Sequence, residues 1–206
     1  MSIPHQPAPA PRTATGTLDT AFDRAFGHPA GLLGRLGGWV MARGNAGTEH
    51  RVVDLARLEP DEIVLVVGPG PGIGLDAAGR LAGEVIGVEP SAEMRALCLE
   101  RCGNRVELRD GSAARTGSAD ASADVVLTVN NVELWEDRAA AFAELFRVLR
   151  PGGRMLLSAH EKGLPVSRHE LADEAAAAGF TDLQTWTWQP PGFAPLAAQL
   201  KAVKPA

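Results

Sequence analysis

The segment 63–74 places the strongest constraint on the fold, because a short apolar run leads there into a turn rich in glycine. The run reads IVLVV, the turn reads GPGPGIG, and the residues that follow can form a helix. A strand, a glycine turn and a helix in this order let a nucleotide-like ligand lie against bare backbone. The dinucleotide pattern G-x-G-x-x-G fails, because its sixth position is Ile73 counted from Gly68 and Leu75 counted from Gly70. The turn therefore points away from NAD and towards another adenosine ligand.

Strands and helices are predicted to alternate from residue 63 onward. The expected strands are 63–67, 84–88, 105–108, 124–129, 154–159, 181–188 and 197–203, and the expected helices are 73–82, 91–101, 137–149 and 167–178. This alternation predicts an α/β fold with a Rossmann-like, doubly wound parallel sheet. Prolines at 190, 191 and 195 leave only a short loop before the last strand, which must therefore run antiparallel to its neighbour.

The chain divides into three predicted parts. Residues 1–17 are rich in Pro, Ala and Thr and are expected to be a disordered tail. Residues 18–60 are expected to form a helical lid over the ligand cleft, with a loop at 43–47 and a helix at 50–58. Residues 61–206 are expected to be the ligand-binding domain.

Composition narrows the function classes. A net charge of −5 with scattered basic residues gives no reason to expect a nucleic-acid partner. We expect no membrane partner and a cytoplasmic location, since no apolar stretch is long enough to span a bilayer and no signal peptide is recognisable. The only cysteines, Cys98 and Cys102, are interpreted as two reduced thiols on one helix face, so no metal site is predicted. The oligomeric state cannot be inferred.

In a doubly wound sheet the ligand lies beyond the carboxyl ends of the strands. Glu89 ends the second expected strand and is suited to accept hydrogen bonds from both ribose hydroxyls; we interpret it as a carboxylate at the surface edge of the sheet. Asp110 follows the third strand and can accept a hydrogen bond from an adenine amine, although Asp-Gly is also a common turn. Met94 is equally compatible with packing on an adenine and with filling the core. The candidate cofactor-binding residues are Gly68, Pro69, Gly70, Gly72, Glu89, Pro90, Met94, Asp110, Gly111, Ser112, Asn130, Asn131 and Trp135.

Five segments, taken in order, resemble the motifs of the class I S-adenosylmethionine-dependent methyltransferases. They are VLVVGPGPGIG, VIGVEPSAEM, ELRDGSA, ADVVLTVNNVELWED and ELFRVLRPGGRMLLS. The last is the most specific, and the nearest subgroup is the small-molecule, or type 11, methyltransferase domain. The resemblance covers about residues 43–203. It implies a seven-stranded sheet whose final strand is antiparallel, with S-adenosyl-L-methionine as the cofactor.

The resemblance also implies roles for single residues. The family's glycines and ribose-binding acid correspond to Gly68, Gly70, Gly72 and Glu89, and its residue after the fourth strand corresponds to Asn130. Many members carry an acid near the methionine amino group, two positions before the first motif glycine, where this chain has Val66. The amino group would then be held by backbone carbonyls or by another side chain.

The expected reaction is in-line methyl transfer to a small-molecule acceptor, in which positioning supplies much of the catalysis. His160 is the candidate catalytic base, with Glu133, Glu161 and His50 as alternatives. A non-catalytic binding or regulatory protein of the same fold stays open, motivated by Val66 and by the lack of a diagnostic base. A nicotinamide-dependent oxidoreductase is disfavoured by the failed dinucleotide pattern. The acceptor atom is not determined.

Overall fold

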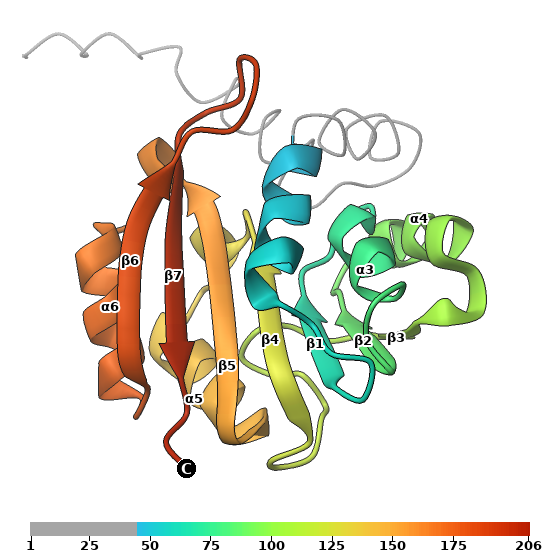
Figure 1. The fold of residues 1–206 in the computed structure, drawn as a ribbon, viewed down its shortest axis with the longest axis horizontal. Helices are drawn as coiled ribbons and strands as arrows, with labels where there is room; N and C mark the ends of the chain where they lie inside the picture. Colours follow the sequence, from blue (N-terminus) through green and yellow to red (C-terminus); the bar gives the residue numbers. More distant parts are fainter. Residues whose placement is uncertain (1–44) are drawn as a thin grey trace, which may run out of the picture.

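The computed structural model describes residues 45–206. Within them lies a seven-stranded sheet of order β3-β2-β1-β4-β5-β7-β6, in which β7 runs antiparallel to both of its neighbours (Figure 1). The strands are β1 Ile63–Val67, β2 Glu84–Val88, β3 Glu107–Arg109, β4 Ala123–Val129, β5 Leu149–His160, β6 Thr181–Trp188 and β7 Ala197–Val203. The predicted fold class, with its reversed final strand, is confirmed.

Helices cover both faces of this sheet. Helix 45–56 and helix α3 lie on one face, and α5 and α6 lie on the other (Figure 1). The bounds are α3 Ile73–Ala78, α4 Ala92–Cys102, α5 Arg138–Val148 and α6 Arg168–Ala177, with 3-10 turns η2 Gly103–Arg105, η3 Val132–Leu134 and η4 Glu161–Gly163. None of the helices within residues 45–206 is long and apolar enough to cross a membrane.

The central position of strand β1 in the sheet explains why its apolar residues run without a break. Val64 and Val66 belong to a core cluster with Val52 and Val53 of helix 45–56, whereas Leu65 packs in the cluster beneath α5 and α6. Side chains alternate between the two faces of a strand, and here both faces are covered. A continuous apolar run is therefore the pattern that a central parallel strand requires.

The predicted boundaries of several elements differ from the structure. Residues 45–47, expected in a loop, begin helix 45–56. This helix uses Val52, Val53 and Ala56 to cover the sheet. The other differences of more than one residue are a first helix, α3, that ends at Ala78, a third strand that starts at Glu107 after the turn η2, and a fifth strand that starts at Leu149. The expected tail at 1–17 and lid residues 18–44 lie outside the described residues.

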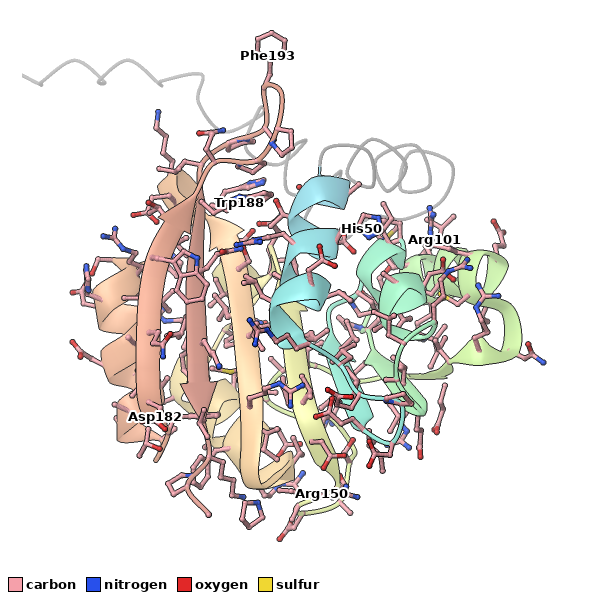
Figure 2. The ribbon with its side chains drawn as sticks, in the orientation of Figure 1. His50, Arg101, Arg150, Asp182, Trp188 and Phe193 are labelled. Carbon is pink, nitrogen blue, oxygen red and sulfur yellow. The ribbon has the colours of Figure 1, made fainter. Side chains whose placement is uncertain are left out.

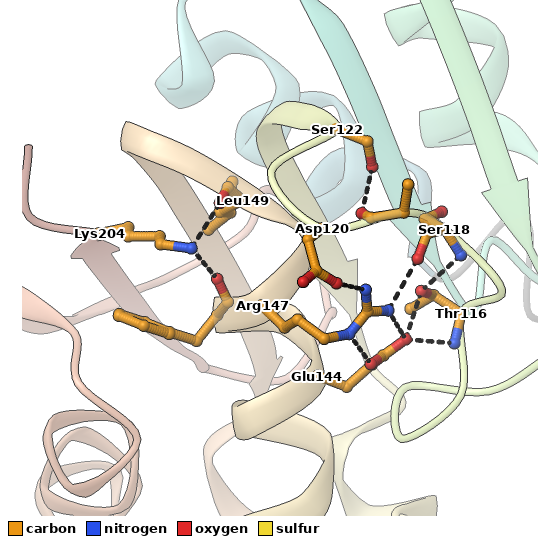
Figure 3. Close-up of polar contacts among 10 residues, drawn as sticks. Thr116, Ser118, Asp120, Ser122, Glu144, Arg147, Leu149 and Lys204 are labelled. Carbon is orange, nitrogen blue, oxygen red and sulfur yellow. Dashed lines mark hydrogen bonds and ion pairs between the residues drawn. The ribbon is translucent and has the colours of Figure 1, made fainter.

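A polar network fastens the loop before β4 to α5 (Figure 3). Glu144 accepts hydrogen bonds from the Thr116 backbone N–H at 2.9 Å and from its hydroxyl at 2.6 Å. Arg147 donates to Glu144 at 2.8 Å and to the Ser118 carbonyl at 2.8 Å, and it also pairs with Asp120. Burial raises the pKa of Glu144, but the hydrogen bonds from Arg147 and Thr116 outweigh it and lower the pKa to about 2.

We expect Glu144→Gln to lower the melting temperature at neutral pH by about 2–4 °C, roughly what 1 kcal/mol produces in a domain of this size. Because the folded pKa lies below the ordinary value of 4.5, this stabilisation is present above pH 4.5 and is lost as pH falls towards about 2. The melting temperatures of the natural protein and of Glu144→Gln, measured across that range, should therefore converge at acid pH. A gap that does not change with pH would contradict the assignment of the charge to this network.

Candidate cofactor site

The residues that follow β1, β2, β4 and β5 meet at one edge of the sheet, because these strands run parallel to one another. The glycine turn after β1 lies at this edge and is fixed by its own backbone. The Gly68 N–H donates to the Val88 carbonyl at 2.9 Å, and the Gly72 N–H donates to the Pro69 carbonyl at 2.9 Å. This backbone bonding couples the turn to the end of β2.

The turn glycines serve different purposes. Gly68, Gly70 and Gly72 all have positive φ angles. A Cβ on Gly68 would lie 2.3 Å from Nδ2 of Asn131, and one on Gly72 would lie 3.0 Å from Sγ of Cys98. A Cβ on Gly70 would meet no atom of residues 45–206 within 4 Å. Internal packing therefore accounts for the first and third glycines, whereas Gly70 borders open space.

Glu89 fastens this turn from the end of β2. Its Oε2 accepts a hydrogen bond from the Gly70 N–H at 3.1 Å, and its Oε1 accepts one from the Ser91 N–H at 3.0 Å. The interpretation of Glu89 as a surface-edge carboxylate is wrong, because only 6% of the residue is exposed. Burial raises its pKa, opposed by those two hydrogen bonds and by Arg95. Each carboxylate oxygen has a second lone pair, so further donors can still bind.

Two candidate residues on the adenine side, Met94 and Asp110, already make contacts within the protein. Met94 is buried in the first turn of α4, where its N–H donates to the Ser91 hydroxyl. Asp110 has a side chain that is 75% exposed and pairs with Arg95 at 3.2 Å. Pro90, Gly111 and Ser112, the other candidates on this side, are adjacent to Glu89 and Asp110 in the chain.

Asn130 and Asn131, adjacent after β4, have opposite surroundings. Asn131 is buried; its Oδ1 accepts from Thr128 at 2.6 Å and from the Trp135 indole at 3.0 Å, and its Nδ2 donates to the Val67 carbonyl at 2.7 Å. Its amide therefore links the end of β4 to the end of β1, where the glycine turn begins. Both amide atoms of Asn130 are buried without a hydrogen-bond partner among residues 45–206, on a backbone with φ of +51°. An unsatisfied buried amide is costly, so Asn130 is suited to meet a polar ligand.

His160 is the last residue of β5 and is half-buried. Burial lowers its pKa, which favours the neutral imidazole that can accept a proton. Among the alternatives, Glu161 is bound to Arg168 at 2.8 Å and His50 is exposed on helix 45–56 (Figure 2). No group of three or more His, Cys, Asp or Glu that could hold a metal occurs within residues 45–206.

Glu49 is the residue that the sequence interpretation missed. It lies on helix 45–56, is only 8% exposed, and accepts a hydrogen bond from the Gly74 N–H at 2.5 Å. Burial raises its pKa to about 7, against the opposing effects of the Gly74 hydrogen bond and of Arg101. A signal was present, because Glu49 occupies the first position of the apolar stripe completed by Val52, Val53 and Ala56.

Two hollows lie beside helix 45–56. The smaller is bounded by the glycine turn and by Glu49, Val52, Val53, Val66, Val67, Leu127 and Val129. A larger one, of about 600 Å³, lies between the end of the helix and β5, β6 and β7, and includes the Arg154–Glu62 ion pair. Only the smaller hollow borders the residues predicted to bind a cofactor, so the site is built around it.

The sequence of this chain is similar to those of known methyltransferases. Residues 65–157 match the family described as "Methyltransferase domain". A probable S-adenosylmethionine-dependent methyltransferase of Mycolicibacterium smegmatis is 40% identical over 95 residues, covering 46% of this chain and 37% of the relative. Phosphoethanolamine N-methyltransferase 1 of Zea mays is 29% identical over 171 residues, covering 81% of this chain and 32% of the relative.

A solved structure has the same fold. It is phosphoethanolamine N-methyltransferase 2 of Haemonchus contortus, in complex with phosphomonomethylethanolamine and S-adenosylhomocysteine. The likeness has a TM-score of 0.71 at 16% identity and covers 83% of this chain and 57% of that one.

The predicted resemblance to the class I S-adenosylmethionine-dependent methyltransferases is therefore confirmed by the matched methyltransferase domain and by the relatives of similar sequence. The chain spans only about a third of the length of the two relatives named above.

Proposed function

We propose that this protein binds S-adenosylmethionine at the glycine turn and transfers its methyl group to a small-molecule acceptor. The observation that carries the proposal is Gly70. Its φ of +51° and its open Cβ position leave bare backbone facing space, and its N–H is held by the buried carboxylate of Glu89. A ligand that must approach backbone closely needs this combination.

The remaining candidates fit an adenosine-type cofactor. Glu89 keeps free lone pairs for ribose hydroxyls, and Asp110 presents an exposed carboxylate for an exocyclic amine. The unpartnered amide of Asn130 offers both a donor and an acceptor. When bound, the cofactor supplies an electrophilic methyl group on a sulfonium. In-line transfer then requires these side chains to hold the reacting groups collinear at near-attack distance.

A small-molecule acceptor is supported by the relatives, two of which are named as phosphoethanolamine N-methyltransferases. A turnover assay with S-adenosylmethionine labelled in its methyl group tests the proposal directly. We expect label to appear in at least one member of a panel of small amines, phenols and hydroxy compounds. Cofactor binding without label transfer to any acceptor would favour the alternative of a non-catalytic binding protein.

We further propose that His160 acts as the general base when the acceptor must lose a proton. His160→Gln should lower kcat by about 100-fold or more and leave cofactor affinity unchanged, because general-base catalysis contributes about 10²–10⁴-fold. The acid limb of the pH–rate profile should also disappear. An unchanged rate and profile would remove His160 from the chemistry, as expected if the acceptor is a neutral amine that needs no base.

A further inference from the structure

We infer that Glu49 supplies the carboxylate that binds the α-ammonium group of the cofactor's methionine end, the place left without an acid by Val66. This inference rests on the proposed function, since it assigns one contact within the cofactor site. It concerns a residue of helix 45–56, outside every motif of the glycine-turn region.

The first argument is position. Glu49 lines the same small hollow as Val66, Gly68 and Pro69. Its Oε2 is fixed by the Gly74 N–H at 2.5 Å, at the beginning of α3. A Cβ on Gly74 would lie 3.0 Å from that oxygen, so the glycine also leaves room for the carboxyl group.

The second argument is charge. A buried carboxylate is costly unless a cation meets it. Within residues 45–206, no Lys, Arg or His forms an ion pair with Glu49. Arg101 of α4 favours the charged form from a distance, but its Nε donates to the Pro71 carbonyl at 2.8 Å. Among the described residues, the Glu49 carboxyl group therefore has no cationic partner.

The third argument is the chemistry of the ligand. The methionine end of S-adenosylmethionine carries an α-ammonium group, which needs acceptors and gains most from a carboxylate. Glu89 is committed to the Gly70 and Ser91 N–H groups at the ribose side, and Val66 offers no polar atom. Glu49 is the remaining carboxylate that lines the hollow bordered by the turn.

The test is a comparison of two ligands by calorimetry: S-adenosylhomocysteine, and its analogue with hydrogen in place of the α-ammonium group. The natural protein should bind S-adenosylhomocysteine about 10- to 100-fold more tightly, the range of a charge-assisted hydrogen bond. Glu49→Gln keeps an acceptor for the Gly74 N–H but removes the charge. Glu49→Gln should therefore reduce the preference for S-adenosylhomocysteine over the analogue to about threefold or less.

Two further variants sharpen the comparison. Asp54→Asn removes an exposed carboxylate from the same helix and should leave the preference unchanged. Gly74→Ala should reduce it partially, because the new methyl group displaces the Glu49 carboxyl group without removing it. Melting temperatures of all variants separate a change in folding from a change in recognition.

The pH dependence gives a second readout. The groups facing Glu49 are the Gly74 N–H of α3 and, from α4, Arg101 and Cys98, whose thiol has a pKa raised by burial and is neutral. A carboxyl group with a pKa of about 7 must lose its proton to bind an ammonium group. Affinity for S-adenosylhomocysteine should therefore rise as pH increases through about 7, and this rise should vanish in Glu49→Gln.

The outcomes are separable. If Glu49→Gln weakens both ligands equally, or lowers only the melting temperature, Glu49 is an anchor for helix 45–56 and the inference is wrong. If Glu49→Gln leaves the ligand preference intact, the ammonium group is held elsewhere and the inference is also wrong. If the natural protein binds neither ligand, the proposed cofactor site itself fails.

Discussion

Gly70→Val is expected to reduce affinity for S-adenosylhomocysteine by at least about 100-fold, the largest effect of any single change proposed here. The valine side chain would enter the space that Gly70 leaves open, where no atom of the described residues lies within 4 Å of the added Cβ. The loss should therefore come from blocking the ligand, with no clash against the protein's own atoms. Calorimetric titration of the natural and altered proteins measures it.

The matched control is Gly152→Val. Gly152 also has a positive φ, +79°, and an open Cβ position. It lies near Arg150 at the start of β5, at the edge of the sheet opposite the glycine turn (Figure 2). Both substitutions carry a backbone cost of about 1–2 kcal/mol, but only one faces the proposed ligand. Equal binding losses in the two variants would mean that strain, and not obstruction, explains the result.

Glu89→Ala is expected to weaken S-adenosylhomocysteine binding by about 10- to 150-fold, the equivalent of about 1.5–3 kcal/mol for hydrogen bonds to a charged group. The carboxylate is proposed to bind the ribose, and it also holds the N–H groups of Gly70 and Ser91. Removing it leaves those donors without their partner, so the melting temperature should fall as well. This expectation follows from the burial of Glu89, since an exposed carboxylate would carry little stability.

Glu89→Gln separates the two roles. The amide oxygen can still accept from one backbone N–H, so stability should partly recover while the charge-assisted contact to the ligand is lost. Titrating each variant with S-adenosylhomocysteine and with its 2′-deoxy analogue isolates the ribose contact. If the natural protein and Glu89→Ala discriminate equally between the two ligands, Glu89 does not bind the 2′-hydroxyl.

Sequence reasoning could predict the sheet because hydrophobic patterning and turn chemistry specify it locally. The strands 63–67, 84–88, 181–188 and 197–203 agree with the structure at both ends. The start of β5 could not be predicted, since Pro151, Gly152 and Gly153 suggest a break in structure. In the fold, the Gly152 N–H donates to the Lys204 carbonyl at 2.9 Å, and this long-range contact extends the strand through the glycines.

The site was only partly predictable for a similar reason. The chain order places Gly70 and Glu89 at one edge of the sheet, and the structure joins them by a hydrogen bond of 3.1 Å. Sequence spacing could not show that the Asn131 amide is hydrogen-bonded within the protein. It also could not show that the amide of its neighbour Asn130 has no partner among the described residues. Glu49 was missed because its partner, Gly74, lies 25 positions away in the chain.

The central claim is that the glycine turn binds S-adenosylmethionine, and titration calorimetry of the natural protein tests it most directly. Parallel titrations with S-adenosylhomocysteine and NADH are compared at the same protein concentration. The account predicts saturable binding of S-adenosylhomocysteine and no binding of NADH, because the turn lacks the dinucleotide spacing G-x-G-x-x-G. Saturable binding of NADH without binding of S-adenosylhomocysteine would contradict it.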